Sequence, residues 1–365
     1  MAESAPMRGF ATPEGTAAYR ARLGARVGEG HFRTWQGLAL SSVGIGTYLG
    51  QEDEATDRAY QAAVRRALEL GLNVVDSAVN YRHQRSERNV GTALRALVTE
   101  VRIAREDVLL ATKGGFMPHT AESYVRSGIA RADEVVGDAH CIAPRYLADQ
   151  LDRSRANLGV ETIDVYYVHN PETQLGAVDQ PTFMARMRAA FEFLEGAVSD
   201  GKIRWYGTAT WTGYRQPVTA RDHLSLPGLV GLAREVAGEG HHFGVIQVPY
   251  NLAMTEAMTV ASQRIGKASI PVMQAAEQLG IYVMTSASML QGKLARNLPP
   301  ALAQVLDGLG TDAQRALQFA RSTPGVGTAL CGMQRVAHVE ENARLVGVPP
   351  APSEKLFSRP EAERP

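Results

Sequence analysis

Four side chains with complementary chemistry follow strand-like segments of the sequence. Asp76 ends the stretch "NVVD", Lys113 follows "LLAT", His169 follows "DVYYV", and Tyr81 comes five residues after Asp76. Burying a carboxylate among valines costs free energy unless another group compensates its charge. We expect Lys113 to form an ion pair with Asp76 and to lower the pKa of the Tyr81 phenol from its usual value of about 10. Such a phenol can give a proton to a carbonyl oxygen or take one from an alcohol, and His169 can hold that oxygen in line.

Each of these residues also has a simpler interpretation. A single Asp or His at a strand end is often a structural cap, and a single Lys there is usually solvated. Lys113 could instead form a Schiff base, as in a barrel aldolase or a pyridoxal enzyme. The occurrence of the acid, the ammonium and the imidazole on three successive strands favours a shared site for proton transfer.

The elements that would position these residues alternate between strand-like and amphipathic helical patterns. Eight strands, each followed by a helix, predict a parallel (β/α)8 TIM barrel with long loops at its C-terminal mouth, and a doubly wound open sheet is the alternative. The strands are expected at residues 38–48, 72–78, 107–113, 162–169, 203–210, 243–250, 281–288 and 326–332. The helices are expected at residues 54–71, 86–98, 143–159, 182–201, 226–240, 269–280, 311–323 and 336–347.

The predicted domain organisation is a single barrel with two flanking segments. We expect an N-terminal extension over residues 1–32, the barrel over 33–348 and a Pro-rich tail over 349–365, with both flanks extending from the barrel. Three connections after strands are long, at residues 114–142, 170–180 and 286–310. Loops of this length at the mouth of a barrel are usually functional, so we expect residues 114–142 to line a substrate site.

Composition places the chain among ordinary globular proteins. Apolar residues make up 45% of the chain, charged residues make up 21%, and the formal net charge is +0. This balance implies neither a nucleic-acid partner nor a membrane partner. Two cysteines far apart, Cys141 and Cys331, and the lack of an apolar leader predict a cytoplasmic protein. The sequence leaves the oligomeric state open.

Two patterns invite other interpretations and do not meet their requirements. Gly44, Gly46 and Gly50 are spaced G-x-G-x-x-x-G, and no helix begins at the third glycine as a dinucleotide-binding turn requires. His241 and His242 have no third ligand nearby, so we expect a solvated pair and no metal site.

The sequence resembles the aldo-keto reductase superfamily, in the manner of a bacterial member, from about Leu38 to Leu345. The most specific segments are "NVVDSAVNY", "LLATKGG", "IDVYYVHNP", "GVIQVPYNL" and "TPGVGTALCGMQRVAHVEEN". The family's catalytic tetrad of Asp, Tyr, Lys and His falls on Asp76, Tyr81, Lys113 and His169. The resemblance implies a barrel that binds a nicotinamide cofactor in extended form, usually NADP(H), with NAD(H) as the alternative.

Cofactor contacts follow from the same resemblance. Arg335 and the helix that follows the eighth strand would also suit an anion on physical grounds. This sequence departs from the family's pattern at three places. Ala209 and Thr210 stand where Ser and Asn are usual, and Ser286 stands where an aromatic residue is usual. The positions implied are Gly46, Thr47, Tyr48, Asp76, Thr210, Gln247, Ser286, Ala287, Ser288, Met289, Gly292, Gly332, Met333, Gln334, Arg335, His338, Glu341 and Asn342.

The function expected from this resemblance is an NADP(H)-dependent oxidoreductase. Tyr81 would act as general acid or base on a small aldehyde, ketone or sugar, or on the corresponding alcohol. One alternative is a sugar or glycoside dehydrogenase that works in the oxidising direction. Another is a regulatory protein that binds the cofactor and turns over slowly, which the changes at Ala209 and Ser286 favour.

Overall fold

The computed structural model describes residues 5–357, and within them eight parallel strands close into a barrel. The predicted (β/α)8 barrel is therefore confirmed, and the open sheet is excluded. Residues 1–4 of the expected extension and residues 358–365 of the expected tail lie outside the described part of the chain. The barrel strands are β3 (Val43–Gly46), β4 (Val74–Asp76), β5 (Leu109–Gly114), β6 (Ile163–His169), β7 (Ile203–Ala209), β8 (Phe243–Pro249), β11 (Tyr282–Ser286) and β12 (Thr328–Gly332).

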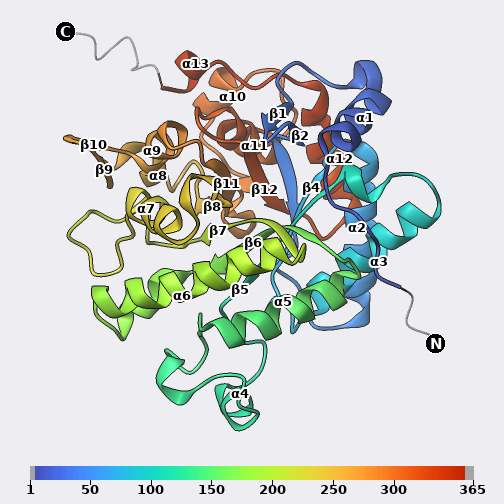
Figure 1. Ribbon diagram of the computed structural model, residues 1–365. Helices are drawn as coiled ribbons and strands as arrows, with labels where there is room; N and C mark the ends of the chain where they lie inside the picture. Colours follow the sequence, from blue (N-terminus) through green and yellow to red (C-terminus); the bar gives the residue numbers. More distant parts are fainter. Residues whose placement is uncertain (1–4, 358–365) are drawn as a thin grey trace.

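Helices surround the barrel, one after each strand (Figure 1). In α2 (Glu54–Leu70) the reasons for the helix are local: the Asp53 side chain caps the N-terminus by accepting from the Thr56 N–H, and Gly71 ends the helix in the left-handed conformation. All eight predicted helices are present. The other seven are α3 (Arg85–Thr99), α5 (Pro144–Leu158), α6 (Gln180–Ser199), α7 (Leu226–Ala237), α9 (Val272–Gln278), α11 (Asp312–Ser322) and α12 (Val336–Asn342).

The N-terminal segment covers the barrel, and our expectation that it extends away is wrong for the described residues. Helix α1 (Pro13–Leu23) buries Tyr19 and Leu23, and the Tyr19 hydroxyl donates to the Leu68 carbonyl oxygen. The predicted first strand breaks at Ser42, because β1 (Phe32–Trp35) and β2 (Leu38–Ser41) form a separate antiparallel hairpin.

That hairpin closes the N-terminal end of the barrel. Trp35 stacks on Tyr282 with ring centroids 5.1 Å apart and lies against Trp205 at 4.8 Å. Leu38 and Leu40 join the same buried cluster as Val74 from inside the barrel. The open end of the barrel is therefore the C-terminal mouth, where barrel active sites lie.

Several short elements were not predicted. They are α4 (Ala121–Arg126), α8 (Glu256–Thr259), β9 (Gln263–Ile265), β10 (Ala268–Ile270), α10 (Ala301–Val305) and α13 (Ser353–Phe357).

No helix among residues 5–357 is long and apolar enough to cross a membrane.

Candidate active site

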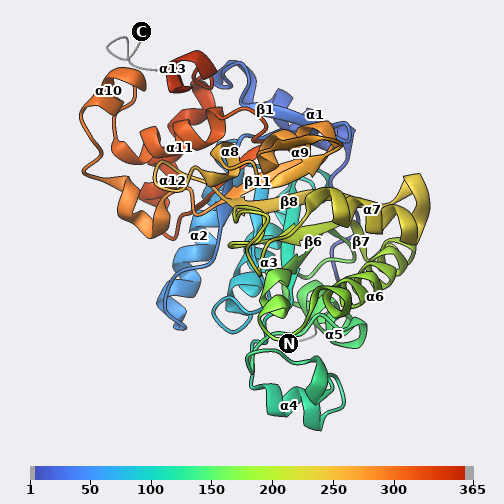
Figure 2. The ribbon, with the colours of Figure 1, turned by 90° about the vertical axis from the view of Figure 1, so that its left-hand side faces the viewer.

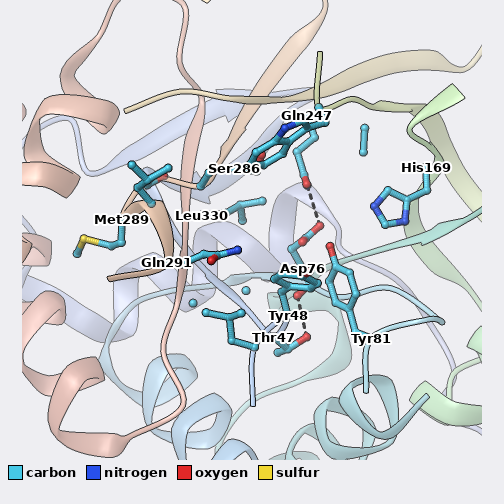
Figure 3. A pocket seen from close by; sticks show the side chains of 18 of the residues that line it. Thr47, Tyr48, Asp76, Tyr81, His169, Gln247, Ser286, Met289, Gln291 and Leu330 are labelled. Carbon is cyan, nitrogen blue, oxygen red and sulfur yellow. Dashed lines mark hydrogen bonds between the residues drawn. The ribbon is translucent and has the colours of Figure 1, made fainter. Parts of the chain in front are cut away.

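A buried ion pair lies at the mouth, between the ends of β4 and β5. The Lys113 ammonium lies 2.6 Å from Asp76 Oδ2 and also donates to the Ser77 carbonyl oxygen at 2.7 Å. Gln247, on β8, donates from Nε2 to the other carboxylate oxygen of Asp76 at 2.8 Å (Figure 3). Asp76 is thus held from two sides, which offsets the cost of burying its charge.

Tyr81 and His169 lie beside this pair. The Lys113 ammonium is 5.0 Å from the centroid of the Tyr81 ring, and the Tyr81 and His169 rings are 6.0 Å apart in an edge-on arrangement. Figure 3 shows the Tyr81 hydroxyl pointing into the space between Asp76 and His169. The structure therefore brings together the three side chains that the sequence places at strand ends and the Tyr81 side chain from the loop after β4.

The expected lowering of the phenol pKa is wrong for this structure. Burial, and after it the Asp76 carboxylate, hold the pKa of Tyr81 well above its ordinary value. Burial lowers the pKa of Lys113, and Asp76 opposes that change. The Asp76 carboxylate already compensates the charge of Lys113, so the pair has little net positive charge with which to stabilise a phenolate at Tyr81. Burial, and then Lys113, lower the pKa of His169 well below its usual value. We therefore expect a protonated phenol beside a neutral imidazole.

Hydrogen bonds behind the four residues fix the strand ends. Thr47 donates from Oγ1 to the Asp76 carbonyl oxygen at 3.2 Å. Thr112, the neighbour of Lys113, donates to the buried carboxylate of Glu87 on α3 at 2.6 Å. The first contact joins the ends of β3 and β4, and the second joins the end of β5 to α3.

Three of the four residues line a cavity of about 690 Å³. Asp76, Tyr81 and His169 line it directly, whereas Lys113 is buried beneath. The predicted cofactor residues that line this cavity are Gly46, Thr47, Tyr48, Asp76, Thr210, Gln247, Ser286, Ala287, Ser288, Met289, Gly292 and Gly332.

The resemblance places the adenine end of the cofactor at Gly332, Met333, Gln334, Arg335, His338, Glu341 and Asn342, and of these only Gly332 lines the cavity. Arg335 lies on the turn before α12 and His338 lies on α12, and both are exposed. Met333 and Asn342 are buried, and Asn342 Nδ2 lies 3.5 Å from Met333 Sδ. The geometry therefore does not support side-chain contacts from those two. The remaining residues of this group outside the cavity lining are Gln334 and Glu341.

Sequence reasoning missed one aromatic and two amide residues of the cavity lining. Trp211 lines it with 47% of its surface exposed, together with Asn80 and Asn170. The buried Glu172 carboxylate accepts from the backbone N–H of Trp211 at 2.6 Å and so holds the turn that carries this ring. A Trp directly after a strand end was the available signal.

The long segment after β5 contributes less to the cavity than predicted. Of residues 114–142, only Phe116 lines it. The segment has a root, where Phe116 pairs with His140 across an antiparallel bridge, and a tip that carries α4. Figures 1 and 2 show α4 projecting away from the barrel in both views. The prediction that this segment forms the substrate wall is therefore wrong for its tip.

The described residues fit a nicotinamide dinucleotide in two respects. Ser288 lines the cavity, and its buried hydroxyl has no hydrogen-bond partner in this structure. A Cβ added at Gly292 or Gly332 would meet nothing within 4 Å, so the surface there is open to a ligand. Ala209 offers only a methyl group, which leaves Thr210 and Gln247 as the polar side chains for a carboxamide.

Comparison with known proteins identifies the type of chain that carries this site. A model of the aldo/keto reductase family matches residues 42–356. The chain is 31% identical over 192 residues to a 6-dehydroglucose reductase of Novosphingobium aromaticivorans, a match that covers 52% of this chain and 53% of that one. It is 22% identical over 331 residues to a probable voltage-gated potassium channel subunit beta of Arabidopsis thaliana, covering 86% and 90% of the two chains.

A solved structure shares the same fold. The aldo/keto reductase from Klebsiella pneumoniae in complex with NADP and acetate superposes with a TM-score of 0.61 and 21% identity. The superposition covers 91% of this chain and 96% of that one.

Proposed function

Because this chain belongs to the aldo/keto reductase family, we propose that it moves a hydride between NADP(H) and a small carbonyl or alcohol substrate. The observation that carries the proposal is the meeting of Asp76, Lys113, Tyr81 and His169 at the base of one cavity. The bound nicotinamide would supply or accept the hydride at the substrate carbon.

The residues of the chain provide the proton and the orientation. In the reducing direction the Tyr81 hydroxyl donates its proton to the carbonyl oxygen, which becomes the hydroxyl of the product. A neutral His169 donates a hydrogen bond to the same oxygen and holds it near Tyr81. Lys113 and Asp76 balance one another's charge as a buried ion pair at the base of the site. Thr210 and Gln247 would orient the carboxamide of the cofactor, and Ser288 would contact its phosphates.

The pKa directions predict a flat pH profile for reduction. Tyr81 remains protonated at a pH above the ordinary pKa of a phenol, and His169 remains neutral at a pH below the ordinary pKa of an imidazole. Neither group therefore changes state between about pH 6.5 and 10. We expect the single-turnover rate of carbonyl reduction at saturating cofactor to stay constant over that range wherever the protein is folded. An apparent pKa of about 7 to 9 in this step would contradict the assignment of the proton donor.

The cofactor preference is expected to depend on Arg335. Its side chain is exposed, and no ion pair to it is found among residues 5–357. Glu340 is paired with Arg66 at 2.9 Å, so its charge does not oppose an anion. A hydrogen bond to a charged group contributes about 1.5–3 kcal/mol, which predicts a preference of roughly ten- to hundred-fold for the 2′-phosphorylated cofactor.

Dissociation constants from fluorescence quenching test this preference. Arg335→Ala should weaken NADP(H) binding and leave NAD(H) binding unchanged. Arg344→Ala, which removes another exposed cation nearby in the sequence, is the control and should change neither. Equal weakening of both cofactors by Arg335→Ala would end the assignment of this residue to the 2′-phosphate.

The cavity favours a neutral hydroxylated carbonyl such as a sugar. Tyr48, Phe116 and Trp211 offer aromatic faces, and Asn80 and Asn170 offer amides, beside the four catalytic candidates. Aromatic faces with adjacent amides suit a ring that has an apolar side and hydroxyl groups. The relative that acts as a 6-dehydroglucose reductase supports this class, over the half of the chain that it matches.

A panel of aldehydes, ketones and sugars with NADPH and NADH, followed by loss of near-ultraviolet absorbance, tests the proposed function directly. Turnover of a carbonyl substrate with NADPH is the expected result. Absence of turnover with every substrate, in protein that binds the cofactor tightly, would contradict it.

That contrary result would support the second candidate, a cofactor-binding regulatory protein. The matches to potassium channel subunits beta and the unusual Ala209 and Ser286 favour this candidate. The proton-transfer residues favour the enzyme.

A further inference from the structure

His140, from the root of the segment after β5, contacts the main chain of His169. Its Nε2 lies 2.7 Å from the His169 carbonyl oxygen, and the side chain is fully buried. The Phe116 ring packs edge-on against both imidazoles, with centroids 4.8 Å from His140 and 5.1 Å from His169. The backbone N–H of Cys141 donates to the Gly115 carbonyl oxygen at 2.9 Å, which fixes the root on the strand that carries Lys113.

The hydrogen-bonding partners determine which ring nitrogen of His140 carries the proton. Arg186, on α6, can only donate, so the Gln174 oxygen that it contacts must accept. The Gln174 amide nitrogen therefore faces His140 Nδ1, 2.8 Å away, and donates to it. Burial lowers the pKa of His140 to about 4, so the ring is neutral at ordinary pH. Its proton is then on Nε2 and is donated to His169.

This contact fixes the peptide that follows His169. The N–H of Asn170 donates to the Ala209 carbonyl oxygen at 2.6 Å, and the His169 carbonyl oxygen accepts from His140. Asn170 has φ of 43°, in the left-handed region, which asparagine adopts more readily than most other non-glycine residues. The peptide between His169 and Asn170 is therefore held at both ends by hydrogen bonds.

The glycine beside this contact leaves room for it. A Cβ added at Gly115 would lie 2.9 Å from the His169 carbonyl oxygen and 3.0 Å from His140 Nε2. Gly115 has φ of 143°, so another side chain there would also be strained. Glycine at position 115 therefore allows His140 to approach the end of β6 closely.

We propose that His140 is a positioning residue, which fixes the end of β6 so that the His169 imidazole faces the substrate oxygen beside Tyr81. The catalytic consequence depends on the proposed reductase function, whereas the effect on His169 itself does not. In this proposal only the root of the segment after β5 contributes to positioning His169, and its projecting tip does not.

Two substitutions at one position separate the two hydrogen bonds of His140. Glutamine places an amide nitrogen near the position of Nε2, so His140→Gln keeps a donor for the His169 carbonyl. Asparagine reaches only as far as Nδ1, so His140→Asn keeps a partner for Gln174 and loses the contact with His169. We expect kcat for reduction to fall roughly 10- to 100-fold in His140→Asn and to stay within about three-fold of wild type in His140→Gln. Cofactor dissociation constants should be unchanged in both.

His31 provides a matched control at the opposite end of the barrel. It is also fully buried, its Nε2 lies 2.9 Å from the Gly71 carbonyl oxygen, and burial lowers its pKa to about 4 as well. His31→Asn should cost comparable stability and leave kcat unchanged. Equal losses of kcat in His31→Asn and His140→Asn would overturn the proposal, because a general loss of stability would then explain both.

The ¹⁵N shifts of the His169 imidazole in ligand-free protein provide a readout that needs no activity. We expect them to change in His140→Asn and to remain as in wild type in His140→Gln and His31→Asn. Unchanged shifts in His140→Asn would overturn the proposal even if no substrate is found, so its failure is distinct from failure of the proposed function. If His140→Asn does not fold, His140→Leu replaces it. Leucine keeps an apolar side chain at this buried position and removes the donor to the His169 carbonyl oxygen, so the same resonances should move; unchanged shifts would again contradict the role of His140.

Discussion

Replacing Tyr81 with Phe is expected to lower the rate of carbonyl reduction by a factor on the order of 10²–10⁴, the usual contribution of a positioned proton donor. The variant removes one hydroxyl that points into the space between Asp76 and His169 and leaves the ring in place. Neither the buried ion pair of Asp76 and Lys113 nor its contact with Gln247 involves that hydroxyl. Single-turnover kinetics with preformed cofactor complex would measure the loss.

Tyr48→Phe is the matched control for this variant. Tyr48 lines the same cavity with its ring 4.9 Å from that of Tyr81, and it is 55% exposed. Loss of its hydroxyl should change the apparent substrate affinity more than the rate of the chemical step. If Tyr81→Phe retains turnover near that of wild type while Tyr48→Phe does not, the proton donor has been assigned to the wrong phenol.

Lys113→Met is expected to have two large effects. The substitution leaves the Asp76 carboxylate buried without its cation, which costs about 3–5 kcal/mol of unfolding free energy. The Asp76 carboxylate already raises the pKa of Tyr81. Without the compensating charge of Lys113, it should raise that pKa further. Alcohol oxidation requires the phenolate as base, so its pH–rate profile should move to higher pH. Denaturant unfolding measures the first effect, and initial rates of oxidation between neutral and alkaline pH measure the second.

Two controls distinguish these effects from general damage. Arg105→Met breaks an equally buried ion pair with Asp164, 2.6 Å long, at the N-terminal end of β6. It should cost similar stability and leave the pH profile of oxidation unchanged. The double variant Asp76→Asn with Lys113→Met removes both charges and should recover most of the stability without recovering activity. A folded, active Lys113→Met protein with an unaltered pH profile would exclude the electrostatic role of this lysine.

Much of the barrel and of its candidate catalytic residues was predictable because the signals are local. A strand that ends in a polar residue, followed by an amphipathic helix, shows where Lys113 and His169 must lie once the barrel closes. The break at Ser42 was not predictable, since the apolar residues on either side of it continue the same pattern. Helix α1 was missed because its charged exposed face resembles a solvated extension, while Tyr19 and Leu23 are buried against the barrel.

The remainder of the site depends on contacts between distant segments. Trp211 faces the cavity on a turn held by Glu172, which lies on a different loop, and no spacing in the sequence indicates that contact. The direction of the Tyr81 pKa shift differs from the prediction because burial, which depends on the folded surroundings of the ring, outweighs the charges nearby. His140 was unremarkable in sequence, since its contact with His169 requires the segment after β5 to fold back at its root.

The hairpin that closes the N-terminal end of the barrel also bears on how the chain is synthesised. Trp35 emerges from the ribosome early, whereas Tyr282, on which it stacks, follows about 250 residues later. At roughly 5–20 residues per second, this delay is on the order of 10–50 seconds. During that time the apolar face of the hairpin lacks its final partners, so a chaperone that shields nascent chains would have its greatest effect there. The fluorescence of Trp35 should report the packing of β11 against the hairpin.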